Sequence, residues 1–108
     1  MIVYHVTSLA KLKEYLKIGF IMPPVGAWTD IKEAERFSLT TGRLIILRLW
    51  FPDDAPKMEG HMGKAVYIDV PYPINMWLSS SDKIEAYFSR LAASSKYQRR
   101  EINERSGL

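Results

Sequence analysis

The sequence predicts an α+β fold that combines a small sheet with two helices in the N-terminal half and one C-terminal helix. Short β-branched and aromatic runs, which are typical of strands, alternate with amphipathic segments of helical spacing. The chain has 108 residues, a length typical of one domain. We therefore expect a single domain over residues 1–95, followed by a basic tail or frayed helix over residues 96–108.

The beginning of the chain predicts a strand and a helix. Residues 2–6 form a β-branched and aromatic run that indicates a strand. Thr7 or Ser8 then caps a helix with its hydroxyl, and Gly19 suits a left-handed helix end. The Pro-Pro pair at 23–24 lacks two amide donors, so we expect an extended crossing segment there.

A second helix and a strong strand follow. Asp30 and Glu33 have the spacing of a capping box, and Gly42 suits the end of the helix. Residues 43–51 include four consecutive apolar side chains, a pattern typical of a strand that is covered on both faces. We therefore place this strand centrally in the sheet.

The rest of the domain is expected to contain a long loop, further strands and the last helix. Residues 52–64 are rich in proline, glycine and charge, which is typical of a loop. Residues 65–70 indicate a strand, and residues 72–78 indicate a short last strand after a proline-broken start. A helix capped by Ser81 or Asp82 is then expected, with four residues on its apolar face: Ile84, Tyr87, Phe88 and Leu91.

The composition excludes several kinds of site. Without cysteine, the chain has no disulfide framework, no thiol nucleophile and no thiolate-bound metal. Its two histidines, His5 and His61, lie far apart in the sequence, so we expect no metal centre. No apolar run approaches the roughly 18–20 residues of a membrane span, and no signal peptide is recognisable. We therefore expect a cytoplasmic protein without a membrane partner.

The basic charge is concentrated at the C-terminus. The 15 Lys and Arg residues oppose 12 Asp and Glu residues, and residues 96–108 hold four basic against two acidic side chains. Lys96, Arg99 and Arg100 surround Tyr97 there, a pattern that favours contact with nucleic acid. One interpretation is therefore a non-enzymatic module that binds nucleic acid or protein.

Residues 4–51 contain an ordered series of short motifs. They are Tyr4-His5-Val6-Thr7-Ser8, Lys17-Ile18-Gly19-Phe20-Ile21, Ala27-Trp28-Thr29-Asp30, Glu33-Ala34-Glu35-Arg36-Phe37 and Leu44-Ile45-Ile46-Leu47-Arg48-Leu49. Their order and spacing resemble the N-terminal half of the ADP-ribosyltransferase superfamily, which includes diphtheria-toxin-like and PARP-like enzymes and RNA 2′-phosphotransferases. The resemblance implies a split core of mixed or antiparallel strands around a cleft that binds NAD.

The same resemblance implies three cofactor-binding residues. His5 matches the family histidine that hydrogen-bonds the NAD ribose, a role that suits an imidazole with one donor and one acceptor. Trp28 and Thr29 match the part of the pattern that lines the nicotinamide pocket, where an aromatic side chain stacks on a flat, electron-poor ring. Val6 stands where the family usually has glycine.

The family uses a glutamate to stabilise a developing oxocarbenium ion, and this sequence does not identify that residue. The candidates are Glu59 in the expected loop and Asp69 in the next strand, and neither lies in a Glu-x-Glu or Gln-x-Glu pattern. The resemblance therefore leaves open whether the chain is an NAD-dependent ADP-ribosyltransferase or only binds a small nucleotide.

The RNA 2′-phosphotransferase branch of the superfamily binds a phosphate through basic residues. Guanidinium groups bind phosphate oxygens in a bidentate manner, which makes arginine the favoured residue for this task. The candidate phosphate or nucleic-acid ligands in this sequence are Arg36, Arg43, Arg48 and His61.

Structural roles are alternatives for the same residues. A histidine at a strand end, such as His5, is also typical of a hydrogen-bonded structural residue, and Trp28 also suits packing against a helix start. The arginines also suit ion pairs. A further alternative is a catalytically degenerate homo-oligomer with four residues at its interface: Trp50, Phe51, Met76 and Trp77.

Overall fold

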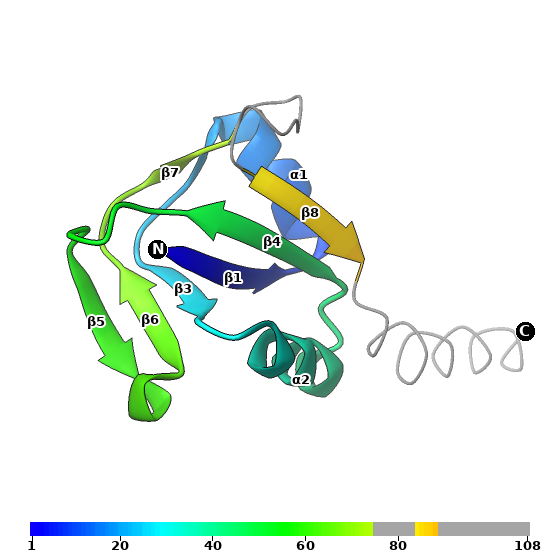
Figure 1. Ribbon diagram of the computed structural model, residues 1–108. Coiled ribbons are helices and arrows are strands. Elements are labelled where there is room, and N and C mark those ends of the chain that lie inside the picture. The colour runs from blue at the N-terminus through cyan, green and yellow to red at the C-terminus, as the bar shows by residue number, and fades with distance from the viewer. Residues whose placement is uncertain (75–83, 89–108) are drawn as a thin grey trace, which may run out of the picture.

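The computed structural model describes residues 1–74 and the backbone of residues 84–88. Within these residues the strands form a six-stranded antiparallel sheet and a two-stranded one (Figure 1). The six strands are, in spatial order, β5 (Lys57–Gly60), β6 (Ala65–Ile68), β3 (Val25–Trp28), β1 (Ile2–Thr7), β4 (Ile45–Trp50) and β8 (Ile84–Phe88). The small sheet pairs β2 (Phe20–Ile21) with β7 (Tyr72–Pro73), and the helices are α1 (Leu9–Ile18) and α2 (Ile31–Thr41). The predicted α+β class is confirmed.

Both helices that were predicted in the N-terminal half form, with the expected cap residues, although Glu33 pairs with Arg36 and Lys64 instead of completing a capping box with Asp30. At the start of α1, the Ser8 hydroxyl accepts from a first-turn amide at 3.2 Å, and Gly19 ends the helix at φ 92°. Asp30 caps α2 by accepting from an amide at 3.0 Å, and Gly42 ends this helix at φ 73°. Glycine adopts such positive φ values without the steric cost of a Cβ atom. These four residues therefore set both helix boundaries.

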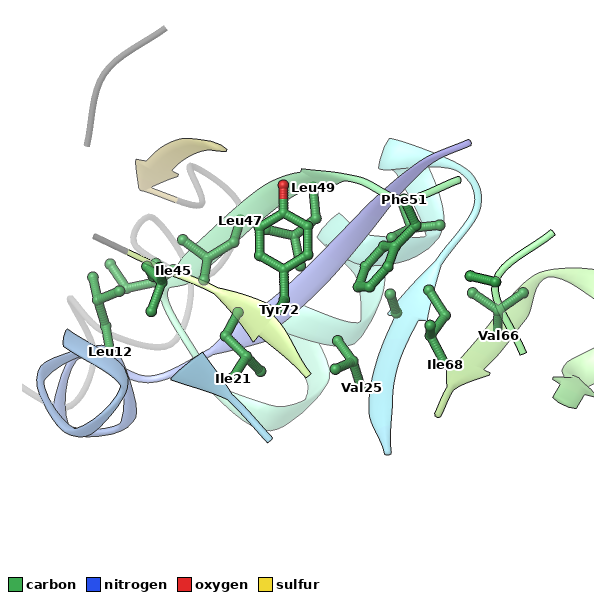
Figure 2. Close-up of a cluster of buried hydrophobic side chains, with 14 residues drawn as sticks. Leu12, Ile21, Val25, Ile45, Leu47, Leu49, Phe51, Val66, Ile68 and Tyr72 are labelled. Atoms are coloured by element: carbon green, nitrogen blue, oxygen red, sulfur yellow. The ribbon is translucent and has the colours of Figure 1, made fainter. Parts of the chain in front are cut away.

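The larger part of the core lies between the sheet and a layer formed by α1 and the β2–β7 pair. Alternate residues of β4 point into it: Ile45, Leu47 and Leu49. Figure 2 shows this cluster, which Tyr72 joins from the small sheet. Ile46 points to the opposite face, where it packs with Ala34 of α2. Strand β4 is thus covered on both faces and lies between β1 and β8, as the sequence predicted.

The prediction of a loop over residues 52–64 is wrong in part. Lys57–Gly60 form the edge strand β5, and His61–Gly63 form a short 3₁₀ turn, η1, before β6. β5 pairs with the whole of β6, from Lys57 opposite Ile68 to Gly60 opposite Ala65. Edge strands tolerate proline and charged residues, which are also typical of loops. The composition of residues 52–64 therefore did not distinguish an edge strand from a loop.

The prediction of a C-terminal helix is wrong for residues 84–88, the part of this segment that the structure describes. Residues Ile84–Phe88 form β8, which pairs antiparallel with β4 from Phe88 opposite Ile45 to Ile84 opposite Leu49. The apolar residues at positions 84, 86 and 88 also have the period of two that a strand requires, and the apolar β4 supplies a partner. The other expected features of this region lie outside the described residues: the caps Ser81 and Asp82, Leu91, residues 75–78 and the basic tail.

One expected interface residue is buried instead. Phe51 is 5% exposed and packs edge-to-face on Tyr72, with ring centroids 4.8 Å apart, so it does not form an oligomer surface. Trp50 is half-buried beneath the Arg48 guanidinium, which lies 5.0 Å from its ring centroid. Met76 and Trp77 lie outside the described residues. In the part of the chain described, no helix combines the length and apolar composition needed to cross a membrane.

Candidate functional site

The large sheet opens between its two middle strands. β1 pairs with β4 along its whole length, whereas its register with β3 joins only Tyr4 and Trp28. Beyond this pair the end of β1 and the start of β3 separate, and a cleft of about 290 Å³ lies there. The cleft is lined from β1, β3, β6, α2 and the η1 turn, and its larger side chains are His5, Trp28, Phe37, Arg43, His61 and Tyr67.

His5 bridges the opening. Its Nδ1 lies 2.6 Å from the carbonyl oxygen of Gly26, and its Nε2 lies 3.1 Å from the Tyr15 hydroxyl of α1. Because a carbonyl oxygen only accepts, Nδ1 carries the proton, and Nε2 accepts from Tyr15. Burial lowers the pKa of His5, and the positive charge of Arg43 adds to this lowering, although the bond to Gly26 opposes it. His5 is therefore a neutral imidazole with both nitrogens engaged.

Trp28 is the centre of an aromatic wall. Its ring centroid lies 5.5 Å from that of Phe37 in α2 and 5.3 Å from that of His61 in η1. The Arg43 guanidinium lies 5.7 Å from the Phe37 ring centroid, so a permanent cation borders the wall. A wall of this kind offers a flat surface to a planar ring and a positive charge to an anionic group beside it.

Local backbone contacts position the basic side of the cleft. Ser38 of α2 is fully buried, and its hydroxyl donates to the Arg43 carbonyl oxygen just after the helix ends. In the η1 turn, His61 and Met62 have φ values of 50° and 59°, a region that non-glycine residues seldom adopt. This turn carries His61 back to the Trp28 ring. Thr29 ties the turn to β3, because its hydroxyl donates to the Lys64 carbonyl oxygen at 3.1 Å.

The cleft unites some of the residues predicted from the sequence. His5, Trp28, Arg43 and His61 all line it, although they are widely spaced in the chain. The same contacts also agree with the structural alternatives, since His5 is hydrogen-bonded on both nitrogens and Trp28 packs against α2 through Phe37.

Other predicted residues lie elsewhere. Thr29 bonds the η1 turn, Arg48 covers the Trp50 ring, and Arg36 pairs with Glu33 at 3.2 Å. Neither candidate carboxylate lines the cleft: Glu59 is exposed on the edge strand β5, and Asp69 borders a second groove.

Sequence reasoning missed three residues of the cleft and its surroundings. Phe37 and Tyr67 are walls of the cleft, and Tyr15 holds His5 from α1. Phe37 and Tyr15 resemble ordinary members of apolar helix faces, and Tyr67 resembles an ordinary strand residue. Only the spatial pairing of β6 with β3, which places Tyr67 opposite Gly26, reveals its position.

Tyr67 also borders a second groove on its other side. This groove has a volume of about 490 Å³ and is lined by Pro24, Pro56, Lys57, Met58, Tyr67 and Asp69. A Cβ atom built on Gly60 would lie 3.0 Å from the Tyr67 ring, and one built on Gly26 would lie 3.5 Å from it. Glycines on both neighbouring strands therefore leave the space that the Tyr67 ring fills.

Comparison with known proteins adds no assignment to this geometry. A scan against protein-family models finds no match to the chain, and searches of curated proteins and of solved structures find none either. Within residues 1–74, no three histidine or acidic side chains lie close enough together to hold a metal ion.

Proposed function

We propose that this chain binds NAD or another nucleotide containing ADP-ribose in the cleft between β1 and β3. The observation that carries the proposal is the convergence of His5, Trp28, Arg43 and His61 on one opening in the sheet. The sequence resemblance named His5 and Trp28 for this role, and basic residue type named Arg43 and His61. Their common location supports a single nucleotide site.

The chemistry of the lining suits the two ends of such a ligand. The Trp28 ring lines the cleft and suits stacking on a nicotinamide or adenine ring, because the nicotinamide is flat and poor in electrons and every base presents a π face. Arg43 borders the same wall and suits the phosphate oxygens, to which a guanidinium donates two hydrogen bonds. His61 contacts the Trp28 ring and adds a donor on the side of the η1 turn.

His5 makes binding an exchange of partners. Both of its nitrogens are already engaged, so a ribose hydroxyl that donates to Nε2 takes the place of the Tyr15 hydroxyl. One hydrogen bond replaces another of similar strength, and the net gain in binding free energy is small. Tyr15→Phe removes the competing hydroxyl and should therefore strengthen nucleotide binding.

Transfer of ADP-ribose is a separate step that this site supports less well than binding. A carboxylate next to the reacting sugar would stabilise the positive charge that develops there. Glu59 and Asp69 lie outside the cleft lining, so the proposal is nucleotide binding, and it names no catalytic residue.

Titration calorimetry with NAD and with ADP-ribose tests the proposal. We expect binding to wild-type protein and a loss of about fivefold or more in affinity for Trp28→Leu, because aromatic stacking on a base contributes about 1–3 kcal/mol. Trp50→Leu is the matched control, since Trp50 lies outside the cleft, and its affinity should equal that of wild type. Circular dichroism verifies that both variants fold.

Further results bear on the assignment. Because the bond to His5 adds little net binding free energy, affinity should fall only slightly in His5→Ala, and it should rise in Tyr15→Phe. The absence of binding heat with either nucleotide at millimolar concentration would refute the proposal. Equal losses in Trp28→Leu and Trp50→Leu would also contradict it, because they would place the effect in the stability of the fold.

The alternative of a nucleic-acid-binding module depends on Lys96, Arg99 and Arg100, which lie outside the described residues. A chain truncated before residue 96 separates the two functions. Nucleotide binding in the cleft should survive the truncation, whereas salt-sensitive binding of nucleic acid through the tail should disappear with it.

A further inference from the structure

Strand β5 forms one edge of the large sheet (Figure 1). Among the described residues it pairs with β6 alone, so one side of its backbone faces outward. The side chains of Lys57, Met58 and Glu59 are all exposed, and Met58 retains 71% of its accessible surface. An edge of this kind is able to pair with another strand.

The hydrogen-bond pattern shows which backbone groups face outward. The Pro56 carbonyl oxygen accepts from the Asp69 amide at 2.8 Å, so Pro56 directs its backbone towards the β6 side. Backbone direction alternates along an antiparallel strand, and Met58 and Gly60 therefore also face β6. Lys57 and Glu59 consequently direct their N–H and C=O groups to the free edge.

We propose that β5 pairs antiparallel with β5 of a second copy of this chain, around a two-fold axis at Met58. In this register Lys57 of each copy lies opposite Glu59 of the other. Residues opposite each other with outward-facing backbone groups exchange two hydrogen bonds, so the two pairs form four. Met58 then lies opposite Met58 of the second copy in the closer, non-hydrogen-bonded type of pair.

In this register the side chains of β5 in one copy are complementary to those of β5 in the other. Lys57 and Glu59 lie on the same face of the strand, so both cross-strand pairs join opposite charges, which is favourable. The Lys57 ammonium is held beside the strand, where it donates to the Asp53 carbonyl oxygen at 2.7 Å, and it has further protons to donate. On the other face, Met58 lies beside Tyr67 at the mouth of the apolar groove, and Met58 of the second copy covers it.

Charged side chains on an edge strand can also be interpreted as a device against pairing. Charged residues on edge strands often prevent pairing, and like charges directly opposite each other are destabilising. In β5 the charges alternate around Met58, so pairing about this residue brings lysine to glutamate and not lysine to lysine. The order of the charges therefore favours a second copy of this chain as the partner.

Sedimentation equilibrium of the full chain at up to millimolar concentration tests the proposal. We expect a weak dimer, because three paired residues per chain form a small interface. Lys57→Glu and Glu59→Lys each place like charges opposite each other at both pairs, so each should raise the dissociation constant by about tenfold or more. Lys13→Glu, an equal charge change at an exposed residue of α1, is the matched control and should leave it unchanged.

Charge exchange makes the test specific to this register. A mixture of the Lys57→Glu and Glu59→Lys chains restores both opposite-charge pairs, so it should form a heterodimer of wild-type affinity. The double variant that exchanges the two residues should again form a homodimer. A strict monomer at millimolar concentration overturns the proposal, as does a dimer whose affinity is unaffected by either single variant.

Discussion

His5 of β1 donates from Nδ1 to the Gly26 carbonyl oxygen of β3 at 2.6 Å, across the place where the two strands no longer pair. The backbones of these strands share only the Tyr4–Trp28 pair. A side chain thus supplies the connection that the sheet backbone lacks. The neutral imidazole therefore lines the cleft, and its hydrogen bond to Gly26 limits how far β1 and β3 separate.

The first prediction concerns the pH dependence of stability. Burial lowers the pKa of His5 from 6.5, so between the two values the unfolded chain binds more protons than the folded one. The free energy of unfolding should therefore fall as the pH decreases below about 6.5, by at most about 1.4 kcal/mol per pH unit from this residue. Urea denaturation of wild type and His5→Gln between about pH 7.5 and about pH 5 measures the difference in slope. Identical slopes would contradict the prediction.

The second prediction concerns the support of Arg43 at the basic side of the cleft. Ser38→Ala removes the buried hydroxyl that donates to the Arg43 carbonyl oxygen, just after the end of α2. We expect a loss of about 1–2 kcal/mol in the free energy of unfolding, measured by urea denaturation. Thr41→Ala removes an exposed hydroxyl of the same helix, which donates to the Phe37 carbonyl oxygen at 2.8 Å and accepts from the Arg43 amide at 3.4 Å. Because both bonds are open to water, this change should lower the free energy of unfolding by less than about 0.5 kcal/mol. Equal losses in the two variants would show that the buried Ser38 hydroxyl contributes no more than an exposed one.

The third prediction compares the two glycines under the Tyr67 ring. Gly60 has an extended backbone with φ −144°, so alanine is allowed there, but its Cβ would lie 3.0 Å from the ring. At Gly26 the corresponding distance is 3.5 Å, which is ordinary van der Waals contact. Gly26→Ala should gain about 0.4–1 kcal/mol from the lower entropy of the unfolded chain. Gly60→Ala should be less stable than Gly26→Ala, because the Tyr67 ring has to move, and a thermal melt of both variants decides the order.

Ligand binding should show the reverse order. The methyl group of Gly26→Ala enters the cleft and should weaken nucleotide binding, whereas Gly60 does not line the cleft. A Gly26→Ala variant that binds nucleotide as tightly as Gly60→Ala would place the ligand elsewhere.

The fourth prediction concerns the Tyr72 hydroxyl, which accepts from the Trp50 amide at 3.2 Å. Tyr72→Phe removes this acceptor and should lower the free energy of unfolding by about 1 kcal/mol at neutral pH. Burial raises the pKa of Tyr72 above 10.0, so the unfolded chain loses this proton first and wild-type stability falls as the pH rises above about 10. Tyr72→Phe should lack this part of the alkaline loss. Tyr67→Phe, which alters an exposed hydroxyl, is the matched control.

The sequence by itself determined the two helices and their ends. A helix is built from hydrogen bonds between residues four apart, so its caps at Ser8 and Asp30 and its glycine ends act locally. It also determined that residues 45–50 form an interior strand, because a continuous apolar run requires cover on both faces. Family resemblance and residue type were enough to select His5, Trp28, Arg43 and His61 as candidates.

Only the tertiary structure decided which of these candidates share a site. A strand completes its hydrogen bonds on another strand. β8 became a strand through β4, which is distant in sequence, and β5 through β6, its partner across the η1 turn. The same long-range pairing opened the sheet beyond the Tyr4–Trp28 pair and brought His61 to Trp28. It also placed Glu59 on an outer edge, away from the cleft. Local capping residues determined α1 and α2, whereas the strand at residues 84–88 and the position of a side chain in this cleft depend on strand pairings that no local pattern contains.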